Sequence, residues 1–415
     1  MLKKNNQLLF TPFKINKLQI ANRIVRAATY EGLAEDESGM PSDNLLELYS
    51  RLAQNGVGMI ITGFNFTSVH GRAMQTRQCG IDDDQKMLKW KKIIEEFKRR
   101  QQEDSCKIFM QISHAGRQTT HLLTGEQVLA PSSVKCTYFR ERPRALSEKE
   151  ILMIVEEYAS AAKRVQEAGF DGVQVHCAHG YLIHQFFSTH TNRRRDKFGG
   201  SVENRFRFLD LILTRIREIC GEDFALITKV SLGDDRTLTL EEVTQFVAMM
   251  IESKKVDAIE FSYGTMEYAM NIFRGDVPID IVLKHNMLFK DLPALLKKFW
   301  TTFLYPLFFK NKLKGFSNNY NLASALALLE NLSKQHQLKI PLILTGGVRS
   351  GNDIEDIIAN KQITAVSISR PLICEEDFVL KVKNDSSYQS KCINCNLCAV
   401  MCDSGRPTRC YKQHK

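Results

Sequence analysis

The chain has 415 residues, of which 43% are hydrophobic and 25% charged, and its formal net charge is +10. This composition is typical of a soluble globular protein with a large core. The N-terminal residues lack the apolar run of a signal peptide, and no stretch is long and apolar enough to span a bilayer, so we expect a cytoplasmic protein. The basic residues are spread along the chain without a recognisable nucleic-acid-binding module, which indicates a solvated basic surface with some phosphate contacts.

Eight short apolar runs alternate with amphipathic segments of helical length. The predicted strands are residues 24–28, 58–62, 107–112, 172–176, 226–230, 257–261, 340–344 and 364–368. The predicted helices are residues 42–55, 82–103, 147–168, 202–220, 239–254, 321–337 and 351–360. Near-continuous apolar strands separated by helices indicate a parallel sheet buried on both faces, and eight such units favour closure. We therefore predict an α/β protein with a (β/α)8 TIM barrel over residues 1–380.

Two regions do not fit the strand–helix repeat. Residues 263–320 form a long insertion after the sixth strand, and its stretch 281–316 is aromatic and basic. It could be a lid over the site, a surface for a partner or second copy, or a membrane-surface helix. Pro306 is expected to interrupt any long helix there. The other region is the tail at 381–415, which is rich in cysteine.

The most informative segment follows the fourth predicted strand, where barrels of this kind place active-site residues. His176 and His179 lie three residues apart at the strand's exit, and Tyr181 follows. Two imidazoles there can donate hydrogen bonds to one oxygen and stabilise negative charge developing on a carbonyl, and the phenol is a candidate proton donor. Taken alone, the histidines could also be zinc ligands or hydrogen-bonded core residues, which are the lesser alternatives.

From about Leu9 to Phe378 the chain resembles the Old Yellow Enzyme family of FMN oxidoreductases. The similarity is greatest to the branch that contains 2,4-dienoyl-CoA reductase and NADH:flavin oxidoreductases. The motifs that carry this resemblance are NRIVRAATYEG at 22–32, NGVGMIITG at 55–63, QISHAGRQ at 111–118, HCAHGYLIHQFFS at 176–188, NRRRDKFGGSVENRFRF at 192–208, LTGGVRS at 344–350 and SISRPLICEEDF at 367–378.

The resemblance implies catalytic and FMN-binding roles for matching residues. His176 and His179 match the pair that binds the substrate carbonyl, and Tyr181 matches the proton donor to the α-carbon. Gln111 matches the residue that hydrogen-bonds the flavin pyrimidine edge, and Lys229 stands where the family has a cation near flavin N1 and O2. The residues expected to contact the isoalloxazine ring are Ala27, Ala28, Thr29 and Gly63.

The phosphate of FMN is expected beside the last two strands. Gly346, Gly347, Ser369 and Arg370 resemble the family's phosphate-binding group. Glycine lets backbone N–H groups approach a phosphate closely, arginine pairs with it, and these two loops are the usual phosphate site of such barrels. The family more often has glycine at the position of Ser369.

The tail suggests a metal or a cluster. Cys392, Cys395, Cys398 and Cys410 follow the spacing C-x2-C-x2-C-x11-C, with Cys402 as a further candidate. Crowded thiolates in a cytosolic chain suit a cluster or zinc better than disulfides. Iron–sulfur members of the family have a similar tail with one more residue in the second gap. We expect a [4Fe–4S] cluster and leave open zinc or no metal.

The chain contains no Gly-rich dinucleotide fingerprint after the barrel, whereas the iron–sulfur relatives continue into a second half that binds FAD and NAD(P)H. If the cluster forms, its electron donor is then another protein; if it does not, NAD(P)H reduces FMN directly at the barrel mouth.

The predicted function is hydride transfer from reduced FMN to an α,β-unsaturated carbonyl or enoyl substrate. An amine dehydrogenase of the trimethylamine dehydrogenase kind, an NADH oxidase and a non-catalytic electron-transfer subunit are the alternatives. The sequence does not name the substrate, choose NADH over NADPH, or set the oligomeric state, although family members commonly associate.

Overall fold

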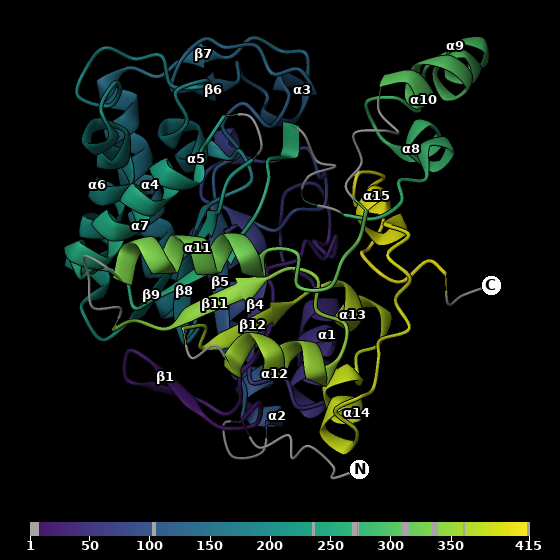
Figure 1. Cartoon of the computed structure of the whole chain (residues 1–415). Helices are drawn as coiled ribbons and strands as arrows, with labels where there is room; N and C mark the ends of the chain where they lie inside the picture. Colours follow the sequence, from purple (N-terminus) through teal and green to yellow (C-terminus); the bar gives the residue numbers. More distant parts are fainter. Residues whose placement is uncertain are drawn as a thin grey trace.

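The computed structural model describes residues 8–101, 105–234, 237–267, 272, 274–308, 315–333, 339–359 and 362–412. Its centre is a closed barrel of eight parallel strands in the order β10-β11-β12-β3-β4-β5-β8-β9 (Figure 1). These strands are β3 (Ile24–Arg26), β4 (Met59–Phe66), β5 (Lys107–Ser113), β8 (Gly172–Cys177), β9 (Ala225–Ser231), β10 (Ala258–Ser262), β11 (Leu342–Thr345) and β12 (Ala365–Ile368). All eight predicted strands are confirmed, and so is the TIM-barrel fold.

Helices cover the outside of the barrel, and all seven predicted ones are present. They are α1 (Asp43–Gln54), α2 (Asp84–Arg100), α4 (Glu148–Glu167), α6 (Val202–Cys220), α7 (Leu240–Ser253), α11 (Leu322–Ser333) and α12 (Gly351–Ala359). Residues 102–103, 334–337 and 360, at the predicted ends of three helices, lie outside the described residues. Capping residues fix where two of these helices begin. Ser147 with Glu150 at α4, and Thr239 with Glu242 at α7, form capping boxes that satisfy the first free backbone N–H groups.

A hairpin that we did not predict closes the N-terminal end of the barrel. Strands β1 (Phe13–Ile15) and β2 (Leu18–Ile20) pair antiparallel, and Asn16 turns the chain with a φ of 52°. Phe13, Ile15 and Ile20 pack against the apolar lower layers of the barrel interior. The alternation in FKINKLQI was the available signal, because it places every second residue on the buried face.

Short elements follow several strands. They are η1 (Val69–Gly71), α3 (His121–Thr124), the pair β6 (Leu129–Ala130) and β7 (Arg144–Ala145), α5 (Leu182–Phe187), α13 (Arg370–Cys374) and α14 (Phe378–Asn384). The tail adds α15 (Leu397–Cys402), which packs near α8 (Ile279–His285) of the insertion (Figure 1). Tail and insertion therefore meet although more than a hundred residues separate them.

The insertion also contains a projecting helical arm, residues 294–308. It consists of α9 (Ala294–Phe299), the π-helical turn η3 (Trp300–Leu304) and α10 (Tyr305–Phe308). Residues at both junctions keep right-handed helical angles, so the helix is continuous and the expectation that Pro306 interrupts it was wrong. The π-helical turn directly before Pro306 explains this. It shifts the backbone hydrogen bonds of the helix, so the missing N–H of proline disrupts them less.

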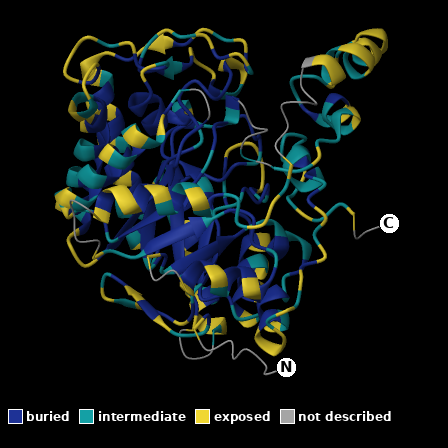
Figure 2. Ribbon diagram, in the orientation of Figure 1, coloured by how far each residue is buried: buried dark blue, intermediate teal, exposed yellow. Residues whose placement is uncertain are grey.

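The barrel and the segments added to it differ in how far they are buried. The barrel strands are buried, while much of the arm is exposed (Figure 2). Among the described helices, none combines the length and the apolar content that crossing a bilayer demands.

Candidate active site

A cavity of about 680 Å³ lies at the C-terminal ends of the barrel strands. Its volume falls within the range of about 300–1,000 Å³ that is usual for small-molecule sites. The predicted site residues that line it are Ala27, Ala28, Thr29, Gln111, His176, His179, Tyr181, Lys229, Ser369 and Arg370. The fold thus brings residues from five strand ends to one place.

The two histidines and the tyrosine form the centre of the cavity. The His176 ring lies 5.1 Å from the His179 ring and 5.0 Å from the Tyr181 ring, measured between centroids. His179 has a left-handed backbone (φ 60°), and Gly180 follows with a φ of 79°. This turn brings the His179 side chain back beside the strand end, where its Nε2 lies 2.8 Å from Ser262 Oγ.

Burial sets the protonation of these groups. It lowers the pKa of both imidazoles well below the ordinary value, and the Lys229 ammonium lowers it further. Burial also raises the pKa of the Tyr181 phenol above its usual range. At neutral pH the histidines are therefore uncharged hydrogen-bond donors, and the tyrosine retains its proton.

A chain of buried polar side chains forms the floor of the cavity. Gln111 Nε2 donates to Gln174 Oε1 at 2.7 Å, and Gln174 Nε2 donates to Glu260 Oε2 at 2.7 Å. Lys229 Nζ lies 3.1 Å from the other carboxylate oxygen of Glu260, and both side chains are almost fully buried. Thr345, on the next strand, also donates to Glu260.

Glu260 is ionised in this setting. Burial by itself raises the pKa of Glu260, but Lys229 and hydrogen bonds from Thr345, Ser367 and Gln174 bring it below the ordinary value. In the floor, the Lys229 ammonium is therefore balanced by the Glu260 carboxylate. The Gln111 side-chain amide lies next to it and can donate or accept a hydrogen bond.

The upper rim has groups that suit a phosphorylated cofactor. Thr29 Oγ1 and Ser369 Oγ lie 2.9 Å apart and join the first and last strands of the barrel. The Arg370 guanidinium donates to Arg274 O and Asn396 Oδ1, each at 2.8 Å. His176 Nδ1 is buried and lacks a hydrogen-bond partner among the described residues. A large cavity with a buried cation, a hydroxyl pair and a guanidinium fits the FMN that the resemblance implies.

Three expected flavin contacts do not line the cavity. Gly63 N donates to Glu31 Oε1 at 2.7 Å, and an added Cβ would meet the same carboxylate, so Gly63 faces Glu31 behind the strand ends. Gly346 and Gly347 have positive φ values of 132° and 84°. Residues 317–321 pack where their side chains would be, with Asn321 Nδ2 donating to Thr345 O at 2.7 Å.

The tail cysteines lie close to one another beside the cavity. Burial, together with the nearby thiols of Cys392 and Cys395, raises the pKa of Cys398 to about 12. Cys374, which the sequence did not connect with the tail, is hydrogen-bonded to Cys410. Cys402 points to Cys398 O and Thr408 Oγ1, at 3.2 and 3.1 Å. Across the described ranges, no three His, Cys, Asp or Glu side chains are arranged to hold a single metal ion.

Sequence reasoning missed two carboxylates of the site. Glu260 had a weak signal, because it is an acidic residue in an otherwise apolar strand. Asp403 had none: it comes from the tail and accepts hydrogen bonds from Gln75 and Asn286, each at 2.9 Å. Burial raises the pKa of Asp403 to about 6. The place of both carboxylates in the site is set by contacts between segments that lie far apart in the sequence.

The chain is similar to known proteins over most of its length. Residues 8–290 match the family described as the NADH:flavin oxidoreductase / NADH oxidase family. The NADH oxidase of Thermoanaerobacter brockii is 34% identical over 405 residues, which are 96% of this chain but 54% of that protein. The NADPH dehydrogenase of Bacillus subtilis strain 168 is 34% identical over 270 residues, 64% of this chain and 77% of the relative.

A solved structure supports the fold. A 2-naphthoyl-CoA reductase in complex with 2-naphthoyl-CoA superposes with a TM-score of 0.78 at 22% identity, covering 96% of this chain and 56% of that one. The chain thus spans about half the length of this reductase and of the Thermoanaerobacter relative.

The ion pair in the cavity floor leads to a test. We expect Lys229→Met and Glu260→Gln each to lower the free energy of unfolding by about 3–5 kcal/mol, because each leaves one charge buried without its partner. The double variant should lose clearly less than the sum of the two. Urea unfolding at neutral pH measures all three.

The matched control is the exposed pair of Lys17 and Asp223, whose side chains are 70% and 74% exposed. Lys17→Met with Asp223→Asn should change stability by less than about 1 kcal/mol. Additive effects at Lys229 and Glu260, or single effects as small as the control, would contradict the pairing.

Proposed function

The chain belongs to the NADH:flavin oxidoreductase / NADH oxidase family, and on this basis we propose that it is an FMN-dependent oxidoreductase that reduces the double bond of an α,β-unsaturated carbonyl or enoyl compound with electrons from NAD(P)H. The observation that carries the proposal is the meeting of His176, His179 and Tyr181 in one cavity above a buried cation. Neutral donors beside a protonated phenol suit a reaction in which charge builds on a carbonyl oxygen and a carbon is then protonated.

FMN is proposed to bind along the floor and rim of this cavity. Lys229 and Gln111 face its pyrimidine side, Thr29 with Ala27 and Ala28 contact the ring, and Ser369 and Arg370 hold the phosphate. The resemblance also implies contacts from Gly346 and Gly347 to the phosphate and from Gly63 to the ring, but these three glycines do not line the cavity, and Gly63 N donates to Glu31. When bound, FMN supplies the hydride that the β-carbon accepts.

The protein's own side chains act on the carbonyl oxygen and the α-carbon of the substrate. His176 and His179 donate hydrogen bonds to the carbonyl oxygen, where negative charge develops as the β-carbon accepts hydride. The Ser262 hydroxyl, 2.8 Å from His179 Nε2, orients that ring. Tyr181 gives its phenolic proton to the α-carbon and regains a proton from solvent, so the substrate gains one hydride and one proton.

NADH oxidation with oxygen as the acceptor is the second candidate. The observation in its favour is the similarity to the Thermoanaerobacter NADH oxidase along 96% of this chain. Oxygen reduction needs no proton donor to a substrate carbon, so the two candidates differ in their dependence on Tyr181.

The tail is proposed to hold a [4Fe–4S] cluster through Cys392, Cys395, Cys398 and Cys410. Support comes from the ligand spacing and from the proximity of the thiols of Cys392, Cys395 and Cys398. The described residues do not fit a single metal ion, and no step of the proposed reaction passes through the tail. With a cluster in place, an electron-donor protein would be its partner.

The histidine pair gives the first functional prediction. Replacing both His176 and His179 with alanine should slow NAD(P)H-driven reduction of 2-cyclohexenone by about 10²–10³-fold, because both donors to the carbonyl oxygen are lost. FMN content per chain should be unchanged in an absorbance spectrum. His121→Ala removes a side chain that is 62% exposed and should have no effect. Undiminished enone turnover in the double variant would refute the assignment.

The tyrosine separates the two candidate reactions. Tyr181→Phe should slow enone reduction by about 10²-fold or more, since the proton donor is lost, while NADH oxidation by oxygen stays within a few-fold. Tyr30→Phe is the matched control and should leave enone reduction largely unchanged. The rings of Tyr30 and Tyr181 lie on the same Phe64 ring, with centroid distances of 5.9 and 5.5 Å. Equal losses in both reactions would argue against a proton-donor role.

Iron analysis tests the tail. Protein purified anaerobically should contain iron and sulfide, and Cys398→Ser should lose them because a ligand is removed. Cys402→Ser should retain them, because that thiol is directed to Cys398 O and Thr408. Iron-free unaltered protein would sink the cluster proposal, and iron loss in both variants would disprove this choice of ligands.

A further inference from the structure

The arm, residues 294–308, exposes a row of large apolar side chains. The exposed fraction is 83% for Leu295, 49% for Phe299, 60% for Phe303 and 71% for Leu307. These residues follow one another at intervals of four, so they form a continuous ridge along one side of the helix. The Phe299 and Phe303 rings contact each other, with centroids 5.5 Å apart.

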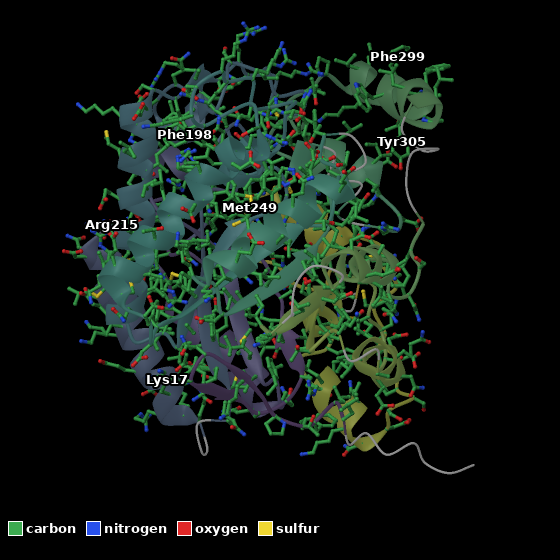
Figure 3. The ribbon with its side chains drawn as sticks, turned by 60° about the vertical axis from the view of Figure 1, so that its left-hand side comes forward. Lys17, Phe198, Arg215, Met249, Phe299 and Tyr305 are labelled. Atoms are coloured by element: carbon green, nitrogen blue, oxygen red, sulfur yellow. The ribbon has the colours of Figure 1, made fainter. Side chains whose placement is uncertain are left out.

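The ridge stands away from the barrel. Figure 1 shows the arm projecting beyond the barrel's outline, and Figure 3 shows the same from a second direction, with Phe299 and Tyr305 labelled. None of the arm's residues from 294 to 304 is buried. A helix of this length presents about 22 Å of apolar edge to its surroundings, which is costly unless something covers it.

The charge around the ridge is strongly one-sided. Between Ile281 and Phe308 the sequence has four lysines, Lys284, Lys290, Lys297 and Lys298, and a single acidic residue, Asp291. Lys284, Lys290 and Lys298 are exposed. A helix with leucine and phenylalanine on its apolar side and lysines beside them has the composition of helices that lie in a membrane interface.

We propose that the arm docks this protein on the surface of an anionic lipid bilayer. The Leu295, Phe299, Phe303 and Leu307 side chains enter the boundary between headgroups and acyl chains, and the lysines lie against the lipid phosphates. A second copy of the chain fits less well. Pairing two arms about a twofold axis would bring the lysines of the two chains together, with only Asp291 of each chain nearby to balance them.

The other face of the arm connects this surface to the cavity. Trp300 and Tyr305 line the cavity, and Tyr305 Oη donates to Val277 O at 3.4 Å. When the arm is docked on a bilayer, the opening of the cavity therefore lies next to the lipid.

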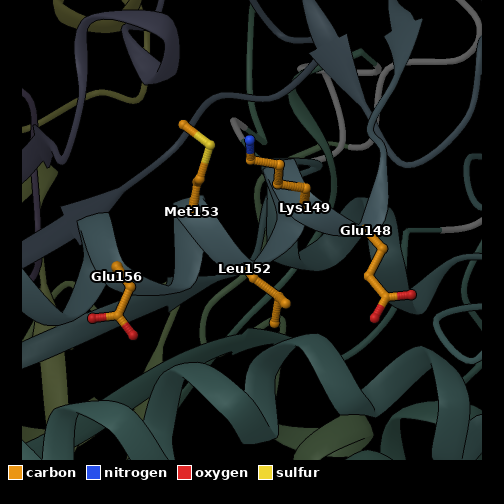
Figure 4. Close-up of a pocket in the computed structure, with 5 residues that line it drawn as sticks. All are labelled: Glu148, Lys149, Leu152, Met153 and Glu156. Atoms are coloured by element: carbon orange, nitrogen blue, oxygen red, sulfur yellow. The ribbon is translucent and has the colours of Figure 1, made fainter.

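A second exposed apolar patch provides the internal comparison. Leu152 and Met153 on α4 are 43% and 53% exposed and border a shallow depression together with Glu148, Lys149 and Glu156 (Figure 4). This patch has two carboxylates and one ammonium, so it lacks the positive excess of the arm.

Vesicle flotation of the 415-residue chain tests the proposal. The protein should bind vesicles of equal parts phosphatidylglycerol and phosphatidylcholine, and bind pure phosphatidylcholine weakly. The triple variant Leu295→Ser, Phe303→Ser, Leu307→Ser should lose about tenfold or more in binding, because its apolar contacts with the acyl region are removed. Lys297→Glu with Lys298→Glu should weaken binding to the anionic vesicles by about fivefold or more for each lysine.

The control is Leu152→Ser with Met153→Ser, which should bind like the unaltered protein. Apart from Lys297, which is half-buried, these positions are exposed. The variants should therefore keep their fold and their enone turnover in solution, which separates this test from that of the proposed activity. Absence of binding to anionic vesicles, or binding that survives the triple variant, would overturn the proposal. So would a concentration-dependent dimer, seen by light scattering, that the triple variant abolishes, since the arm would then be a subunit contact.

Discussion

A buried carboxylate, Glu260, organises the interior of the barrel around the site. A charge inside a protein must be paired and hydrogen-bonded, or its desolvation outweighs what it contributes. Glu260 meets this demand with Lys229 on one neighbouring strand, Thr345 on the other and Gln174 two strands away. Because Gln174 also accepts from Gln111, these contacts join the strands whose ends form the cavity. The position of the cation in the floor therefore depends on this one carboxylate.

Burial then gives the groups above this floor their chemistry. His176 and His179 lie in a low-dielectric environment close to Lys229, and both effects favour the uncharged ring. The same environment keeps the proton on Tyr181. An exposed cleft with the same three side chains would have partly charged imidazoles at neutral pH. The position of the residues at the bottom of a deep cavity is thus part of what makes them suitable donors.

The floor and the walls of the cavity have different origins. Barrel strands and the loops directly after them provide the floor, and the insertion and the tail provide much of the wall. Asp403 joins these parts, because it accepts hydrogen bonds from Gln75 of a barrel loop and Asn286 of the insertion. Arg370 does the same at the rim through Asn396 and Arg274. In the proposed function, the reacting groups would thus come from the barrel, whereas the segments added to it would control access and selectivity.

The sequence by itself determined the barrel, the order of its elements and the set of residues at the strand ends. These follow from local signals: apolar runs, capping pairs such as Ser147 with Glu150, and motifs whose members lie within a few positions. The tertiary structure alone decided which side chains meet. Lys229 pairs with Glu260, Gln75 with Asp403 and Cys374 with Cys410, while Gly63 turns to Glu31 instead of the cavity. Barrel closure and the return of the tail create these contacts, and neither is encoded in a local pattern, because the partners lie tens to hundreds of residues apart.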